Sequence, residues 1–82
     1  MNIGIPKEII PGETRVALSP ADVRRYLQKG HKIFVETGAG ERASFQDQDY
    51  INAGAKIIKN TQKLFDSAEV ILKVQPMNKK NK

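Results

Sequence analysis

Four short apolar runs recur along this 82-residue chain, and each is separated from the next by a segment long enough for a helix. The runs lie at residues 1–5, 32–36, 56–59 and 69–74. They are continuous rather than strictly alternating, a pattern typical of parallel strands that helices cover on both faces. The order β-α-β-α-β-α-β follows, and it predicts an α/β fold with a short parallel sheet.

The first expected helix has clear start and end signals. Ser19 is a preferred N-cap residue, Pro20 is a preferred first helical residue, and Asp22 favours the positive end of the helix dipole. Gly30 is typical of the residue just past a helix end. We therefore expect a helix over residues 20–29, between the first two strands.

Two shorter helices are expected farther along the chain. In one, Phe45 is placed to pack on Tyr50, and Gly54 ends the helix. In the other, Leu64 and Phe65 are expected to point inward. Each helix lies between two of the apolar runs, as a parallel sheet requires.

The composition excludes several kinds of site. The chain has no Cys and one His, so disulfides and thiolate metal sites are excluded and a His-based zinc site is not expected. His31 follows the first expected helix, where a solvated contact with the helix end is favoured over a general base. No apolar run approaches the ~20 residues of a membrane span, and the amino terminus does not look like a signal peptide. We expect a cytoplasmic protein without direct membrane insertion.

The positive charge is concentrated at the carboxyl terminus. The net charge is +5, and without residues 78–82 it falls to +2. Lysines without an aromatic platform are a weak signal for nucleic acid, so we expect no nucleic-acid partner. We divide the chain into a partial domain, residues 1–76, and a disordered Lys/Asn-rich tail, residues 77–82.

A long loop follows the first strand and carries Arg15. Long loops in short chains are more often functional than decorative. The carboxyl ends of parallel strands share one edge, where open α/β sheets bind ligands. There Arg15 can clamp a carboxylate or phosphate, or pair with Glu8 or Glu13, and the sequence leaves both alternatives open. Lys73 and Gln75 are expected at the same edge, where the last strand ends.

Residues 38–43, with the sequence GAGERA, fit the pattern G-x-G-x-x-A after a strand. Glycines in this pattern let backbone N–H groups approach a pyrophosphate. This turn follows the second strand rather than the first, and Asp47 and Asp49 come sooner than the usual ribose-binding acid. A plain turn is therefore favoured over a nucleotide-binding loop.

Several short blocks stand in a fixed order along the chain: Ile3-Gly4-Ile5-Pro6-Lys7-Glu8, Glu13-Thr14-Arg15-Val16-Ala17-Leu18-Ser19-Pro20, Gly30-His31, Val35-Glu36-Thr37-Gly38-Ala39-Gly40, Ala53-Gly54-Ala55 and Ile71-Leu72-Lys73-Val74. In these blocks and their order, residues 1 to about 76 resemble the N-terminal domain of the alanine dehydrogenase and pyridine nucleotide transhydrogenase family. The resemblance implies a two-domain enzyme, with a catalytic domain of Rossmann-like topology and a separate NAD-binding domain. This chain looks like a Rossmann-like half of that larger catalytic domain.

The resemblance also bears on cofactors and catalytic groups. The family's dinucleotide fingerprint and the catalytic His and Asp of its dehydrogenase branch come later than the segment that this chain matches. We therefore expect no catalytic residue and no cofactor in this chain, whereas the complete family enzymes use NAD and NADP.

One position separates the two branches of the family. In alanine dehydrogenases an Arg and a Lys bind pyruvate or alanine; Arg15 matches the Arg, and the Lys position falls on Gln75. A neutral amide cannot supply the positive charge that polarises a keto acid. The resemblance therefore favours the N-terminal part of a proton-translocating NAD(P) transhydrogenase alpha subunit, which transfers hydride between NAD(H) and NADP(H). We expect this chain to be truncated and inactive alone.

Other functions stay open at this point: a fragment of an alanine dehydrogenase, a non-enzymatic interaction module or a non-functional remnant. The expected partners are other copies of the chain or the remaining transhydrogenase subunits, which would hold it at the periphery of the inner membrane. The strand at residues 70–74 is expected to have an open edge and an uncovered face in this chain. The strands and helices that would cover it are expected in the rest of the domain.

Overall fold

The computed structural model describes residues 1–7 and 17–73. Its elements, in chain order, are β1 (Asn2–Ile5), α1 (Pro20–Gln28), β2 (Lys32–Glu36), the 3₁₀ helix η1 (Glu41–Ala43), α2 (Asp47–Ala53), β3 (Lys56–Ile58), α3 (Thr61–Ser67) and β4 (Val70–Ile71). This alternation confirms the predicted α/β order. The last strand is shorter than the expected run 69–74, whose final residue lies outside the described ranges, as do residues 77–82.

The four strands form one parallel sheet in the order β3-β2-β1-β4. Ile3 of β1 lies opposite Ile33 of β2 and Val70 of β4. The chain moves outward from β1 to β3 and then returns across the sheet to place β4 beside β1. The strand order therefore reverses between β1 and β4.

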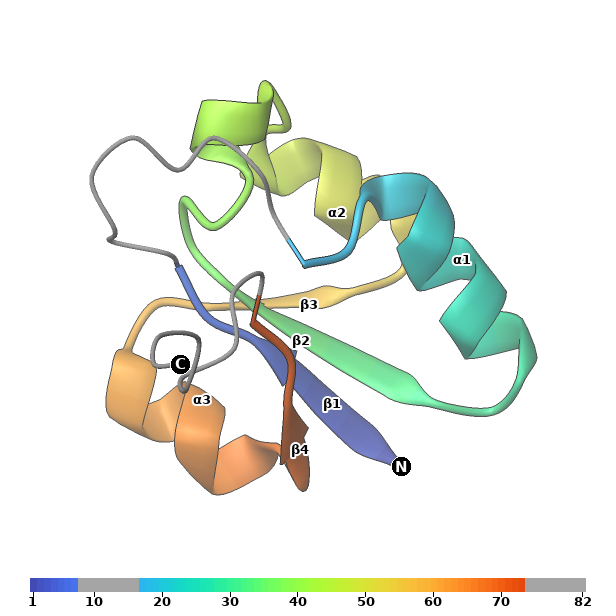
Figure 1. The fold of residues 1–82 in the computed structure, drawn as a ribbon, viewed down its shortest axis with the longest axis vertical. Coiled ribbons are helices and arrows are strands. Elements are labelled where there is room, and N and C mark those ends of the chain that lie inside the picture. The colour runs from blue at the N-terminus through green and yellow to red at the C-terminus, as the bar shows by residue number, and fades with distance from the viewer. Residues whose placement is uncertain (8–16, 74–82) are drawn as a thin grey trace, which may run out of the picture.

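Helices cover both faces of the sheet: α1 and α2 lie on one face and α3 lies on the other (Figure 1). Right-handed crossovers explain this, because the reversal before β4 carries the last connection over the opposite face. At β4, Val70 and Ile71 are half-buried, and the expected uncovered face of this strand stays a prediction. The most deeply buried large side chains are those of Ile5, Val23, Ile33, Val35, Tyr50 and Leu64.

Close packing of α3 on β1 depends on Gly4. A Cβ atom at Gly4 would lie 2.8 Å from Cβ of Ala68 and 3.0 Å from Cδ1 of Ile71. On the same face, Leu64 of α3 is fully buried, as the sequence predicts. Phe65 is 45% exposed, so its predicted inward orientation is wrong. A seven-residue helix turns only a narrow stripe toward the sheet, and Leu64 occupies it.

Local sequence signals fix the starts of α1 and α2. At α1 the N–H of Asp22 donates to Ser19 Oγ, and the Ser19 N–H donates to the Asp22 carboxylate, each over 3.2 Å. At α2 the ring of Phe45 meets that of Tyr50 edge-on, with 6.2 Å between centroids, which confirms the predicted contact. Both helices thus begin at defined residues next to the carboxyl ends of the strands.

Candidate functional site at the carboxyl edge of the sheet

The carboxyl ends of the parallel strands define the candidate site. β1 ends at Ile5, β2 at Glu36, β3 at Ile58 and β4 at Ile71. Ligands of open α/β sheets bind outside these ends, where the strand order reverses. In this chain that position lies beyond the ends of β1 and β4.

The two predicted substrate-binding residues, Arg15 and Gln75, both lie outside the described residues. Their neighbours in the chain are described. Lys7 stands two residues after the end of β1, and Ala17 stands three residues before the start of α1. In the sequence, Gln75 comes four residues after the end of β4, the other strand at the reversal point. The roles of Arg15 and Gln75 therefore stay predictions.

The carboxylate of Glu36 joins three elements at this edge. The backbone N–H of Lys7 donates to Oε1 over 2.8 Å, and the hydroxyl of Thr61 donates to Oε2 over 2.5 Å. One side chain thus ties the chain leaving β1 and the start of α3 to the end of β2. Glu36 is not among the site residues predicted from the sequence, although an acid at the end of an apolar strand is a visible signal.

A second carboxylate, that of Asp47, closes the turn after β2. Its Oδ1 accepts the Gly38 N–H over 2.9 Å, and its Oδ2 accepts the hydroxyl of Thr37. Three further N–H groups of the turn donate to its own carbonyls: those of Ala39, Glu41 and Ala43. Four of the six backbone N–H groups of residues 38–43 therefore bind acceptors of this chain itself, which supports the interpretation as a plain turn.

Tyr50 holds the chain at Leu18, just before the start of α1. Its fully buried side chain donates a hydrogen bond from the hydroxyl to the Leu18 carbonyl over 2.8 Å. Burial, and then the nearby charges of Asp49 and Asp22, raise the pKa of Tyr50 to about 12. The phenol therefore keeps its proton, and donates, across the physiological pH range.

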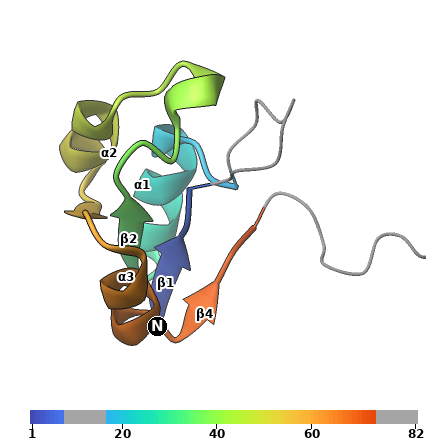
Figure 2. The ribbon, with the colours of Figure 1, turned by 90° about the vertical axis from the view of Figure 1, so that its left-hand side faces the viewer.

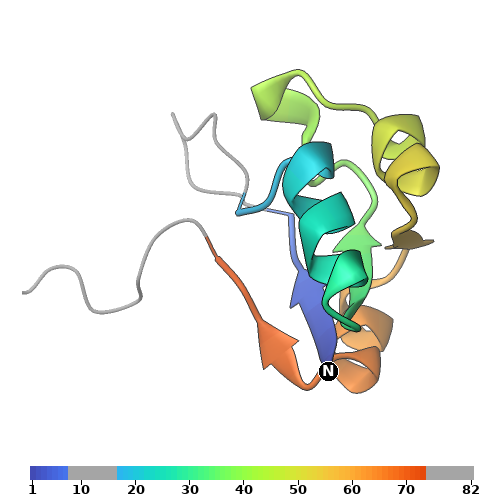
Figure 3. The ribbon, with the colours of Figure 1, turned by 90° about the vertical axis from the view of Figure 1, so that its right-hand side faces the viewer.

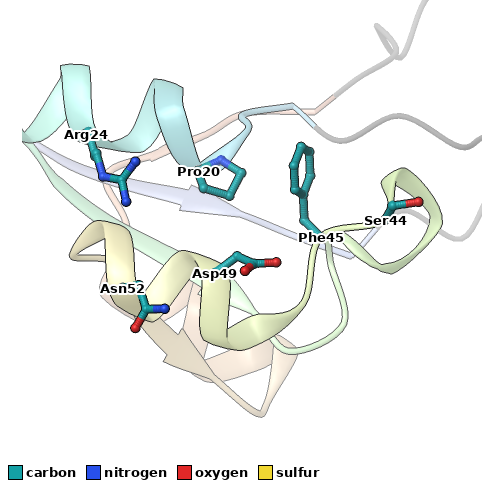
Figure 4. Close-up of a pocket in the computed structure, with 6 residues that line it drawn as sticks. All are labelled: Pro20, Arg24, Ser44, Phe45, Asp49 and Asn52. Atoms are coloured by element: carbon teal, nitrogen blue, oxygen red, sulfur yellow. The ribbon is translucent and has the colours of Figure 1, made fainter.

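A hollow of about 450 Å³ opens between α1 and the start of α2 (Figure 4). Its lining residues are Pro20, Arg24, Ser44, Phe45, Asp49 and Asn52. Arg24 and Asp49 come from different helices, and both side chains are exposed, so water and salt screen their charges. The hollow is lined by helix and turn residues and not by the strand ends that define the candidate site.

The single histidine lies away from the carboxyl edge. The ring of His31 lies 5.8 Å from that of Tyr26. Its Nδ1 is buried and has no hydrogen-bond partner among the described residues, so the predicted solvated contact is wrong for that atom. Within residues 1–7 and 17–73, no group of three or more His, Cys, Asp or Glu side chains could hold a metal ion. No helix in the described ranges is long and apolar enough to cross a membrane.

Comparison with known families decides the assignment. The model of the family described as alanine dehydrogenase/PNT, N-terminal domain, matches residues 4–82. The chain belongs to this family. The resemblance found in the sequence is thereby confirmed.

Curated relatives come from both branches of the family. An alanine dehydrogenase of Methanococcus maripaludis is 45% identical over 75 residues, and an NAD(P) transhydrogenase subunit alpha of Cereibacter sphaeroides is 40% identical over 75 residues. Each match covers 92% of this chain, but only 20% and 14% of the respective relatives. The chain therefore spans a fifth or less of the length of these relatives.

Similar solved structures also come from both branches of the family. An L-alanine dehydrogenase aligns with a TM-score of 0.83 and 46% identity, over 89% of this chain and 20% of that chain. A transhydrogenase from Sinorhizobium meliloti aligns with a TM-score of 0.80 and 38% identity, over 89% and 21% of the two chains. The predicted Rossmann-like fold is confirmed by both.

Proposed function

We propose that residues 1–76 form the amino-terminal part of the substrate-binding region of an alanine dehydrogenase-type oxidoreductase. The observation that carries this proposal is that described residues on either side of Arg15 in the sequence are held by side chains of the fold. Glu36 accepts the backbone N–H of Lys7, and Tyr50 donates to the backbone carbonyl of Leu18. Lys7 follows the end of β1, one of the two strands between which open α/β sheets bind their ligands.

In this proposal Arg15 binds the carboxylate of a small 2-oxo or 2-amino acid. A guanidinium offers two parallel N–H donors that match a carboxylate. Gln75 supplies an amide to the same site, with donor and acceptor groups but no charge. Hydride transfer and the NAD(H) site belong to parts of the enzyme that this chain does not match, so the chain alone is expected to be inactive.

A second candidate is the corresponding part of a transhydrogenase alpha subunit. The neutral Gln75 favours it, as does the transhydrogenase match at 40% identity. We rank it second because alanine dehydrogenases match at higher identity, 45% for the Methanococcus maripaludis protein and 47% for that of Halomonas elongata. The ranking departs from the transhydrogenase assignment that the sequence favoured.

The test is a chimera in which residues 1–76 replace the matching segment of the Methanococcus maripaludis alanine dehydrogenase. We expect weak alanine-dependent NADH formation, a rise of about tenfold or more with Gln75→Lys, and loss with Arg15→Ala. Gln62→Lys makes the same chemical change on the exposed surface of α3 and should have no effect.

The outcomes separate the two candidates. Activity of the unsubstituted chimera that is lost with Arg15→Ala supports the alanine dehydrogenase assignment. Activity that appears only with Gln75→Lys favours the transhydrogenase branch, in which this position is neutral. A chimera that responds to neither substitution would overturn the proposed role of this segment in substrate binding.

A further inference from the structure

The side chain of Lys7 lies at the carboxyl edge of the sheet, against the turn that follows β2. The strands β1 and β2 run side by side in the same direction, so the chain leaves both of them at the same edge (Figures 2 and 3). A Cβ atom added to Gly38 would lie 3.4 Å from Nζ of Lys7 and 3.6 Å from its Cδ and Cε. The lysine side chain therefore lies next to the space that a side chain at Gly38 would fill.

The backbone on both sides of this contact is held by hydrogen bonds. The N–H of Lys7 donates to Oε1 of Glu36 over 2.8 Å, and the N–H of Gly38 donates to Oδ1 of Asp47 over 2.9 Å. Gly38 also has φ +80°, in the left-handed region that favours glycine. The end of β2, the turn after it and the start of α2 together fix where the lysine side chain begins and what it contacts.

The two carboxylates of this network accept other donors. The second oxygen of Glu36 accepts the Thr61 hydroxyl, and the second oxygen of Asp47 accepts the Thr37 hydroxyl. In the part of the chain that the structure describes, neither carboxylate forms an ion pair with Lys7. An ammonium group carries three N–H donors and no acceptor, so that of Lys7 suits a negatively charged ligand at this edge.

A 2-oxo acid presents two groups that a cation stabilises. Its carboxylate is negative throughout, and its carbonyl oxygen gains negative charge as a hydride reaches the carbonyl carbon. In the proposed function the guanidinium of Arg15 binds the carboxylate. The amide of Gln75 adds no charge for the second group, whereas an ammonium group is a compact point charge that suits an oxyanion.

We propose that Lys7 is a substrate-binding residue, which supplies a second positive charge for the oxygen atoms of a 2-oxo acid. This inference rests on the proposed function, in which Arg15 binds the substrate carboxylate. Lys7 stands two residues after the end of β1, one of the two strands between which the sheet order reverses. Glu36 and Gly38 are positioning residues, because they hold the backbone and the side chain of Lys7 at this edge.

The test is a titration of the full 82-residue chain with oxalate, a dianion that resembles a 2-oxo acid, followed by backbone amide NMR at constant ionic strength. We expect a dissociation constant on the order of 1 mM, with shifts at the Lys7 and Gly38 amides. Lys7→Gln removes the charge and should weaken binding about tenfold. Lys7→Arg keeps the charge and should retain binding within about threefold.

Lys59→Gln is the matched control for the loss of one positive charge. Lys59 is exposed and follows β3 at the same edge, but β3 lies two strands from β1 in the sheet order β3-β2-β1-β4. Its substitution lowers the net charge as much as Lys7→Gln does and should leave the oxalate affinity unchanged. A purely non-specific attraction of oxalate to a positively charged chain would respond equally to both substitutions.

Gly38→Asn tests the positioning of the lysine. Asn tolerates a left-handed backbone, and its side chain would compete for the space that Lys7 occupies, so oxalate binding should weaken about fivefold. Gly30→Asn is the matched control, since Gly30 has φ +93° and no atom within 4 Å of an added Cβ. Circular dichroism checks that every variant is folded.

Arg15→Ala separates this inference from the proposed function. Loss of oxalate binding with Arg15→Ala but not with Lys7→Gln would overturn the role of Lys7 and leave the proposed function standing. Loss with Lys7→Gln alone would support the role of Lys7 and contradict that of Arg15. Equal effects of Lys7→Gln and Lys59→Gln, an unchanged affinity of Gly38→Asn, or no oxalate binding up to about 20 mM would each overturn the proposal.

Discussion

The two edge strands of the described sheet, β3 and β4, differ in charge and in the residues that hold them to the rest of the fold. β3 is flanked by Lys56 and Lys59, whereas β4 is flanked by Glu69 and Lys73. Lysines on an edge strand repel the same lysines of another copy, so they oppose pairing of the two edges. Opposite charges at the two ends of a strand suit pairing with an antiparallel copy. The two edges of the described sheet thus differ in the charges of a few exposed residues.

The two edges are also held to the sheet differently. On the β4 side, α3 and β4 approach β1 closely because Gly4 has no side chain. On the β3 side, Gly54 ends α2 with φ +107° and turns the chain into β3. Each edge therefore depends on one glycine, through a close approach at β4 and through a backbone conformation at β3.

The largest effect is expected from Gly4→Val. The new side chain would meet Ala68 and Ile71, displace α3 and β4, and lower the free energy of unfolding by about 3 kcal/mol. Urea unfolding followed by circular dichroism measures the change. Lys32→Val adds the same side chain at an exposed strand position and should change stability by less than about 0.5 kcal/mol. Equal effects of the two substitutions would show that close packing at Gly4 does not hold this edge.

A smaller effect is expected from Gly54→Ala. The positive φ strains any side chain, and the new Cβ would lie 2.5 Å from Cδ1 of Leu27, so we expect a loss of about 2 kcal/mol. Gly30→Ala is the matched control, since Gly30 has φ +93° and no atom within 4 Å of the added Cβ. Gly30→Ala should lower the free energy of unfolding by about 1 kcal/mol, from backbone strain alone. Thermal unfolding that ranks the two variants in the opposite order would contradict this account.

Local signals made the helices and most strand boundaries predictable. The Ser19-Pro20 start of α1, the contact of Phe45 with Tyr50 and the end of α2 at Gly54 each depend on residues close in the sequence. The orientation of Phe65 and the cover over β4 depend on how α3 crosses the sheet. Sequence periodicity does not contain that information, because it follows from the strand order.

The candidate site could also be predicted only in part from the sequence. The sequence places Arg15 and Gln75 after the two strands at which the order reverses, and this remains a prediction for their side chains. The contacts of Glu36 with Lys7 and Thr61 join residues that are 29 and 25 positions apart. Such contacts require the sheet register, so residue type and spacing alone could not reveal them.

The smallest effect is expected from Lys56→Glu, which gives the β3 edge one charge of each sign. Exposed ion pairs contribute about 0.5 kcal/mol each, and a twofold pair holds two of them, so pairing through β3 should strengthen by about fivefold. In sedimentation equilibrium of the variant, association above the level of the unsubstituted chain should appear only near about 1 mM. If Lys56→Glu leaves the mass distribution unchanged, the lysines do not protect β3, and the contrast between the edges must come from strand shape rather than from charge.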